Sequence, residues 1–321
     1  MVRIAQFNHS EYGTIWGEPG DQLKVPGTYE TKDTFSGELE IVPYYGPWEY
    51  VFRCIDVEKS KKLARNAGLT VRNPHVGYSQ NNGEYPRTSF YDELKAAGWD
   101  PSKITNDCNG DCSAGMAAWL CSVGIEVSPD MWTGTEKEII EATGQFLTLT
   151  NDIFTAQDDY LLPGDILLKT GHTAMILDCG DYVKSCVPGV AKGNSWQRYA
   201  PDTKAATIGV VKSEEAVDGY LPIMGGKWWM TENYGRRGWE SEKFIEWLYY
   251  VDITGYMVNV RRRPTINSKV LDTAQLGERF LATGISAEDG RGVTWYQIVD
   301  GDDLGWVSAV YAELGGYILS H

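Results

Sequence analysis

Two residues in this sequence have the types and the surroundings of a nucleophile and its base. Cys112 follows the polar stretch NDCNGD and opens CSAGMAAWLCSV, in which apolar residues recur at helical spacing. Exposed backbone N–H groups and the helix dipole favour a thiolate at the first residue of a helix. His172 begins the apolar run HTAMILD, and a chain with only four histidines offers few other bases. A helix packed on that run would bring imidazole and sulfur together, which indicates attack of a thiolate on an amide carbonyl.

The segments around this pair predict an α+β domain in which a helix packs on an antiparallel sheet. Helices are expected over 56–67, ending at Gly68, over 89–97 and over 112–123. The runs GDILLK and HTAMILD are typical of a tight antiparallel hairpin with a buried strand. From about Gly255 onward, short β-like runs separated by turns predict a small β-barrel.

Length and charge narrow the class of protein. The chain has 321 residues, and 29 Lys and Arg against 44 Asp and Glu give a net charge of −15. At roughly 150 residues per domain, this length suggests about two domains. The acidic excess argues against nucleic acid as a partner, because phosphate binding needs basic clusters. We expect no membrane insertion, because no run approaches the ~18 apolar residues that a spanning helix needs.

The start of the chain and its cysteines indicate a reducing compartment. The start, MVRIAQFNHSEYG, lacks the charged and apolar regions of an export signal. Six cysteines are too few for a disulfide scaffold at this length, so we expect reduced thiols in the cytoplasm. A metal site built from four of them would have the spacings C-x3-C and C-x6-C, which are not the tight pairs typical of zinc. We therefore expect no cofactor, and no metal at Cys108, Cys112, Cys179 and Cys186.

The order of the motifs resembles a known family. DCSAG followed by PGDILLKTGHTAMIL is similar to the NlpC-type and CHAP-type papain-like cysteine hydrolases of peptidoglycan. PWEYVFR, VGYSQ and GWDPSKITNDCNGDCS resemble catalytic domains of lytic enzymes from phages and prophages of Gram-positive bacteria, which extends the resemblance to roughly residues 35–195. It implies a papain-like fold with Cys112 as nucleophile and His172 as general base. It also implies that Tyr78 lines the site, where it either donates to the tetrahedral oxyanion beside the Cys112 backbone N–H, with Gln80 assisting, or packs against the helix.

The residue that would orient His172 departs from the family pattern. NlpC-type enzymes place a His, Asn or Gln on the strand after the base, whereas no histidine follows His172 before His321. The candidates are Asp178, at the end of HTAMILD, and Asn194, in AKGNSW. We favour Asn194, because the resemblance to CHAP-type enzymes implies an Asn on a later strand. Asp111 is expected to cap the helix rather than to join the chemistry.

Residues 257–314 resemble a bacterial SH3-like domain. The similarity lies in MVNVRRRPTINSKVLDTAQLGERF and in WYQIVDGDDLGWVSAVYAEL, and it implies a module that holds the protein on the cell wall. Trp295 and Tyr296 are candidates for contacting sugar and peptide, although aromatic residues of a small barrel can also fill its core. Trp306 is expected in that core.

These patterns divide the chain into three segments. They are a papain-like cysteine hydrolase domain over 1–215, an aromatic-rich linker over 216–252 and an SH3-like cell-wall-binding domain over 253–321. The aromatic residues of the linker are expected to brace the two domains, because adjacent exposed Trp residues favour aggregation. We find no internal repeat at a fixed period.

The predicted function is that of an endolysin. Such a peptidoglycan hydrolase would cleave an amide in the stem peptide, or the amide that joins it to muramic acid, by a Cys-His mechanism. Its partner is bacterial peptidoglycan, and it would stay in the cytoplasm until a phage holin releases it to the host wall. An acyltransferase with the same Cys-His pair and a non-catalytic wall-binding protein are the alternatives. The sequence leaves the oligomeric state open.

Overall fold

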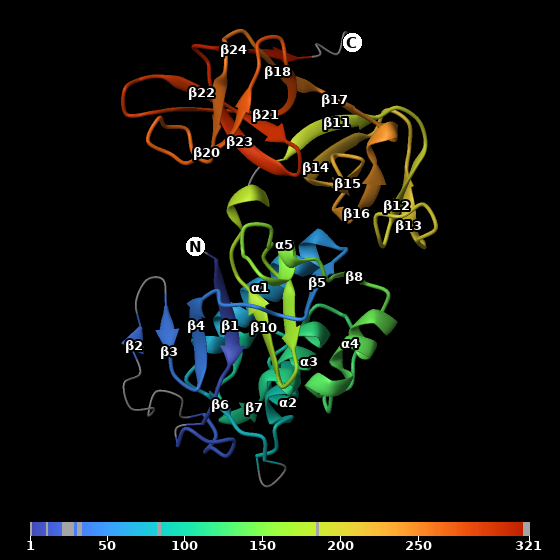
Figure 1. The fold of residues 1–321 in the computed structure, drawn as a ribbon. Coiled ribbons are helices and arrows are strands. Elements are labelled where there is room, and N and C mark those ends of the chain that lie inside the picture. Colours follow the sequence, from blue (N-terminus) through green and yellow to red (C-terminus); the bar gives the residue numbers. More distant parts are fainter. Residues whose placement is uncertain are drawn as a thin grey trace. The chain divides into compact units, whose positions relative to one another are not determined.

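A computed structural model of the protein describes residues 2–10, 12–20, 29–30, 34–81, 85–183 and 186–316. The chain divides into two compact units, over 1–181 and 182–321 (Figure 1). The first unit combines α-helices with a sheet, and the second is built from strands. Among the described residues, no helix combines the length and the apolar character that crossing a membrane requires.

An antiparallel sheet forms the centre of the first unit. Its eight strands lie in the order β2-β3-β4-β1-β10-β9-β5-β8. β10 lies between β1 and β9, with Met175 opposite Ala5 and His172 opposite Lys169. The hairpin expected from GDILLK and HTAMILD is therefore confirmed, and its second strand is interior. The strands are β1 (Arg3–Phe7), β2 (Tyr29–Glu30), β3 (Phe35–Ser36), β4 (Leu39–Pro43), β5 (Tyr50–Cys54), β8 (Phe146–Leu149), β9 (Ile166–Lys169) and β10 (His172–Ile176).

Helices and a small parallel strand pair complete the first unit. The helices expected over 56–67, 89–97 and 112–123 are confirmed, with boundaries shifted by a few residues. The elements are α1 (Val57–Val71), α2 (Ser89–Ala96), α3 (Cys112–Ser122), α4 (Thr133–Ala142) and α5 (Asp152–Thr155), the 3-10 turns η2 (Pro101–Lys103) and η3 (Asp181–Val183), and the parallel strands β6 (Val76–Tyr78) and β7 (Cys108–Gly110).

α1 extends beyond its expected end. Asp56 caps it by accepting a hydrogen bond from the Lys59 backbone N–H at 2.9 Å, but the helix continues through Gly68 to Val71. Its last turn buries Thr70 and Val71. Burial of these side chains outweighs the roughly 1 kcal/mol that a glycine costs inside a helix.

α3 lies entirely within the core. All eleven of its residues are buried, and the helix contacts β1 and β10. A Cβ on Gly115 would lie 2.2 Å from Cε2 of Phe7, so glycine is what allows the helix to approach β1 this closely. The Phe7 ring packs in turn against Trp119 and Phe90, with centroid distances of 5.6 and 5.7 Å. This packing fixes the start of α3 over the sheet.

The second unit contains two antiparallel sheets of seven strands each. We call residues 187–247 the central module and residues 249–316 the C-terminal module. The central module comprises β11 (Val187–Ala191), β12 (Ser195–Arg198), β13 (Thr207–Val211), β14 (Ala216–Ile223), β15 (Trp228–Asn233), β16 (Arg236–Ser241), the 3-10 turn η4 (Glu242–Phe244) and β17 (Ile245–Trp247). The C-terminal module comprises β18 (Tyr249–Ile253), β19 (Val258–Arg261), β20 (Val270–Ala274), β21 (Arg279–Glu288), β22 (Thr294–Asp300), β23 (Asp303–Ser308) and β24 (Ala312–Gly316).

The central module differs from the linker expected over 216–252. Strands β11 and β12 pair with β14 and β16, so a domain boundary at residue 215 would cut through one sheet. Three of the tryptophans that suggested a linker are packed within this sheet. Trp229 and Trp239 are only 1% and 2% exposed, and the ring of Trp247 lies 4.3 Å from that of Trp229.

The C-terminal module confirms the small all-β domain expected there. Its core consists mainly of aliphatic residues from neighbouring strands, including Val251, Val260, Ile298 and Val307. Trp306, expected in the core, is half-buried. His321 lies outside the described residues.

Candidate active site

Cys112 is the first residue of α3. Its predecessor Asp111 caps the helix as expected, because Oδ1 accepts a hydrogen bond from the Ala114 backbone N–H at 2.8 Å. The backbone N–H groups of Ser113 and Thr173 donate to the Cys112 sulfur. Thr173 directly follows His172 on β10. The packing of α3 on the sheet therefore brings the strand that carries the predicted base to the predicted nucleophile.

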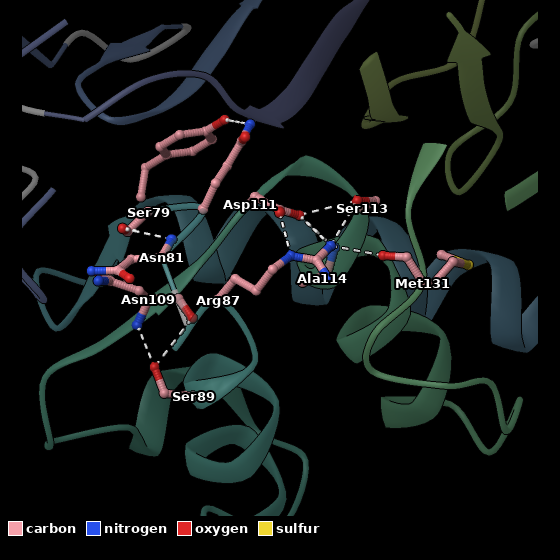
Figure 2. A network of polar contacts seen from close by, with 11 residues as sticks. Ser79, Asn81, Arg87, Ser89, Asn109, Asp111, Ser113, Ala114 and Met131 are labelled. Carbon is pink, nitrogen blue, oxygen red and sulfur yellow. Dashed lines mark hydrogen bonds and ion pairs between the residues drawn. The ribbon is translucent and has the colours of Figure 1, made fainter. Parts of the chain in front are cut away.

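An ion pair holds the start of α3 in place (Figure 2). The Arg87 guanidinium binds both carboxylate oxygens of Asp111, with Nε 2.5 Å from Oδ2 and Nη2 3.0 Å from Oδ1. Nη2 also donates to the Ser113 hydroxyl at 3.0 Å and to the Met131 carbonyl at 2.7 Å. The pair is largely buried, with 12% and 7% of the two side chains exposed. It ties the segment before α2 and the segment before α4 to the first turn of α3.

Burial keeps the Cys112 thiol protonated. Loss of solvation, followed by the charges of Asp111 and Glu136, raises the pKa of Cys112 to about 12. This corrects the expectation of a thiolate at the helix start. A helix dipole contributes only ~0.3–1 kcal/mol, and the cost of desolvating a thiolate is larger. Cys112 is therefore a neutral thiol at pH 7.

Gln6 holds His172 in one tautomer. Nε2 of the ring lies 2.9 Å from Oε1 of Gln6. Because a carbonyl oxygen only accepts, Nε2 carries the proton and the lone pair is on Nδ1. The ring stacks on Trp48, with centroids 5.8 Å apart and planes at 28°. Burial and the nearby Lys169 cation lower the pKa of His172 to about 4, so the imidazole is neutral at pH 7.

Two further side chains fix Gln6 itself. Its Nε2 donates to Oε2 of Glu40 at 3.0 Å, and its Oε1 accepts from the Tyr45 hydroxyl at 2.7 Å. A flipped amide would place its oxygen against the carboxylate, so these partners determine which end faces His172. Sequence analysis missed Gln6, because only strand pairing brings β1 beside β10. The available signal was one uncharged polar residue, Gln6, among the apolar residues of the run IAQF.

The two residues expected to orient His172 are engaged elsewhere. Asp178 pairs with Arg3, at 2.7 Å between Oδ2 and Nε, and also accepts from the Arg3 backbone N–H at 3.0 Å. Asn194 belongs to the second unit, where its Oδ1 accepts from the Ser213 backbone N–H at 3.1 Å. The sequence-based prediction placed the residue that orients His172 after it in the chain. The strand that pairs with β10 at this point comes instead from the start of the chain.

Tyr78 and Gln80 lie beside the loop that carries the nucleophile. Tyr78 ends β6 and pairs with Gly110 of β7, two residues before Cys112. Gln80 donates from Nε2 to the Tyr78 hydroxyl oxygen at 2.8 Å, which leaves the hydroxyl proton for another acceptor. Burial raises the pKa of Tyr78, and the nearby Cys112 adds to the rise, so the phenol stays protonated.

A cleft of about 490 Å³ opens at Cys112. Trp132, one of its lining residues, is 59% exposed. A cleft of this size is within the usual range for small-ligand sites. It is lined by Gln80, Arg87, Asp111, Cys112, Ser113, Asp130, Trp132, Thr133 and Gly171.

Glu136 on α4 is a fully buried carboxyl group near Cys112. Burial raises its pKa to about 8. Its Oε1 lies 2.7 Å from the Thr173 hydroxyl, which also lies 2.9 Å from the Leu167 carbonyl. The hydroxyl has one proton and the carbonyl can only accept, so a protonated Glu136 supplies the second hydrogen bond. Sequence analysis did not single out Glu136, because acidic residues in the first turn of a helix are common caps.

The two aromatic residues expected to bind the wall differ in their surroundings. A pocket of about 450 Å³ in the C-terminal module is lined by Tyr256, Trp295, Tyr311 and neighbouring residues. Trp295 is only 2% exposed, and its indole N–H donates to Asp289, so it forms part of the pocket wall. Tyr296 packs against the core of the module. The freely exposed rings at the pocket are Tyr256 and Tyr311, at 81% and 52%.

Among the described residues, the six cysteines form no disulfide bond. Within the described ranges, no group of three or more His, Cys, Asp and Glu residues could hold a metal ion.

The first unit is thus an α+β unit in which a helix, with a cysteine at its start, packs on an antiparallel sheet that presents a histidine. A family model described as the Endolysin-like domain matches residues 4–183, and the chain belongs to this family. A second model, described as the bacterial SH3 domain, matches residues 257–313. The resemblance to an endolysin with a C-terminal SH3-like module is confirmed, and it supports a peptidoglycan hydrolase.

The solved structures to which the chain is similar are distant. NlpC2 from Trichomonas vaginalis is 11% identical, with 40% of this chain and 48% of that chain covered and a TM-score of 0.21. An NlpC/P60 endopeptidase from Photobacterium damselae subsp. piscicida is 15% identical, with 38% and 33% covered and a TM-score of 0.18. The match spans less than half the length of either chain. No curated protein matches this sequence.

Proposed function

We propose that the first unit hydrolyses an amide bond of peptidoglycan, with Cys112 as nucleophile and His172 as base. The hydrogen bond from His172 Nε2 to Gln6 Oε1 is the observation that carries the proposal. It assigns the ring a tautomer with a lone pair on Nδ1, while the adjacent Thr173 donates to the Cys112 sulfur. A nucleophile, a base and a group that orients the base are the elements that cysteine hydrolases require.

The reaction starts from two uncharged groups, because a pKa of about 12 for Cys112 and of about 4 for His172 keeps both neutral at pH 7. Nδ1 of His172 takes the thiol proton as the sulfur attacks the carbonyl carbon. The charge that develops on the carbonyl oxygen is stabilised by the Cys112 backbone N–H and the Tyr78 hydroxyl. The imidazolium protonates the leaving amine, and a thioester remains. Water then attacks the thioester, giving up a proton to the imidazole, and releases a carboxylic acid and the free thiol.

Gln6 is a positioning residue in this mechanism and takes the place for which Asn194 and Asp178 were candidates. As His172 becomes positively charged, the Gln6 carbonyl dipole continues to accept the Nε2 proton. Glu40 and Tyr45 hold the amide in the orientation that allows this. Gln6 therefore acts through the base and does not touch the substrate.

The substrate class rests on the endolysin-like family and the C-terminal module. We place the scissile amide in the stem peptide or at its junction with muramic acid, and we assign wall attachment to the exposed rings of Tyr256 and Tyr311. The resemblance to phage lytic enzymes supports accumulation in the cytoplasm and release through a holin.

The test is mass spectrometry of fragments released from purified Gram-positive walls by the full-length protein and by its Cys112→Ala variant. We expect new amino groups with the wild type and none with the variant, and the fragment masses then identify the amide. Fragments that persist with Cys112→Ala would refute the nucleophile. New amides formed with an added amine, with no gain of free amino groups, would identify acyl transfer instead.

A further inference from the structure

The central and C-terminal modules have the same strand order. The first sheet reads β13-β12-β16-β15-β14-β11-β17, and the second reads β20-β19-β23-β22-β21-β18-β24. Adding seven to each label of the first order gives the second, so each strand has a counterpart at the same place in the other sheet. Figure 1 shows the central module in yellow to gold and the C-terminal module in orange to red. Only the C-terminal module matches the bacterial SH3 model.

Residue pairs across the strands also correspond. Arg198 faces Trp239 where β12 meets β16, and Arg261 faces Trp306 where β19 meets β23. The pairing register of β12 with β13 shifts immediately before Arg198, and that of β19 with β20 shifts immediately before Arg261. Each arginine then donates from Nη1 to a backbone carbonyl seven residues later, at 2.7 Å in both modules.

The hairpins β15-β16 and β22-β23 match residue by residue. Trp228 faces Ser241 in one, and Trp295 faces Ser308 in the other. Both hairpins close with a two-residue turn, and both contain the sequence Gly-Trp-x-Ser in the second strand. Four identical residues at equivalent positions of an equivalent hairpin indicate a duplicated module and not a chance likeness of two sheets.

The core of the central module explains why sequence comparison misses it. Val260, Ile298 and Val307 form part of the apolar core of the C-terminal module. Their counterparts by register are Gln197, Thr231 and Glu240, which are buried but polar. Gln197 donates to the Thr231 hydroxyl at 3.0 Å, and Thr231 donates to Glu240 at 3.1 Å. A hydrogen-bonded network has replaced the hydrophobic pattern by which such modules are recognised.

At four positions of the pocket lining of the C-terminal module, in contrast, the central module has a residue of the same type, and at a fifth it has a tryptophan. That pocket is lined by Asn259, Arg261, Trp295, Ser308 and Tyr311, among others. The counterparts by register are Trp196, Arg198, Trp228, Ser241 and Phe244. Trp196 and Phe244 are 50% and 45% exposed, comparable with the 52% of Tyr311. The core has changed, while aromatic rings remain in solvent on the face that corresponds to the pocket.

We propose that residues 187–247 are a second SH3-type module that binds peptidoglycan through the face formed by Trp196 and Phe244. The inference rests on the proposed function, which makes the wall the substrate. Exposed Trp and Phe rings suit the apolar faces of sugars and the backbone of a stem peptide. Two modules on one chain bind the same polymer together, so that engagement of the first raises the effective concentration seen by the second.

The test is cosedimentation of the full-length Cys112→Ala protein with purified Gram-positive walls. One variant adds Trp196→Ala and Phe244→Ala, a second adds Tyr256→Ala and Tyr311→Ala, and a third combines all four. Tyr234→Asn is the matched control, because Tyr234 is 85% exposed in the β15-β16 turn and its counterpart Gly301 is outside the pocket. Circular dichroism and thermal unfolding verify that each variant is folded.

We expect each pair of substitutions to weaken wall binding by roughly tenfold or more, the four together to abolish it, and the control to bind like the parent. Unchanged binding by the folded Trp196→Ala, Phe244→Ala variant would overturn the inference. Fragment release by the same variant with Cys112 restored is measured in parallel. Release that continues shows that the proposed hydrolysis stands although the second binding module does not.

Discussion

Replacement of Glu136 by glutamine tests whether a buried carboxyl group beside the nucleophile is uncharged in the folded protein. Glu136 is 0% exposed, and its Oε2 has no hydrogen-bond partner among the described residues. Its pKa is about 8 in the folded protein and 4.5 in an exposed reference state. Between these values the folded state keeps a proton that the unfolded state releases.

The free energy of unfolding should therefore fall as the pH rises through this window. The slope is about 1.4 kcal/mol per pH unit for one proton. The stabilisation is complete below pH 4.5, about 3 kcal/mol of it is lost at pH 7, and the loss levels off above pH 8. The amide introduced by Glu136→Gln cannot ionise, so in the variant this contribution to the slope should vanish. Because the second amide proton of the glutamine also needs a partner, the slope is a cleaner readout than the absolute stability.

Hydrogen exchange of peptides from α3 and β10, read by mass spectrometry between about pH 5 and pH 8, measures the opening free energy of the first unit within the full-length protein. Glu138→Gln is the control, because it removes an exposed carboxylate from the same helix. Parallel pH curves for the wild type and Glu136→Gln would refute the reasoning, since they would mean that Glu136 is not the group that takes up the proton.

Four further outcomes follow from the structure. Gln6→Ala should lower kcat by roughly a hundredfold or more with little change in KM, as measured by fragment release, because the base loses its orienting partner; an unchanged kcat would exclude the positioning role. Lys169→Gln should raise the pKa of His172 by removing a cation, so the acid limb of the kcat/KM profile should move to higher pH. An acid limb that stays at the same pH would show that Lys169 does not affect the pKa of His172. Arg53→Met should cost about 3–5 kcal/mol in urea unfolding, because it leaves Asp165 unpaired where both side chains are 0% exposed. Gly115→Ala should cost about 1–3 kcal/mol by overpacking against Phe7, and Phe7→Leu in the same chain should recover part of that loss.

Signals that are local in the sequence predicted their part of the site well. Cys112 sits at the start of a helix because Asp111 caps it and the following residues are apolar at helical spacing. His172 opens an interior strand because a short turn separates two apolar runs. Both features depend on a dozen consecutive residues, and both are recovered without knowledge of the fold.

Gln6 and the central module could not be found in the same way. The role of Gln6 depends on which strand lies beside β10, and that neighbour is more than a hundred and sixty residues away in the chain. The central module is hidden because Gln197, Thr231 and Glu240 interrupt the apolar pattern of its strands. The family pattern places the orienting group after the base, whereas the proposed positioning residue Gln6 precedes it in the chain.

The position of β1 beside β10 has a consequence for synthesis of the protein. The ribosome makes Gln6 among the first residues of the first unit and His172 among the last, with the helix of Cys112 between them. A nascent or truncated chain that ends before β10 contains the nucleophile but neither the base nor the partner strand that places Gln6. Under the proposed mechanism, catalytic competence therefore appears only when the sheet of the first unit is complete, and unfinished chains are inactive.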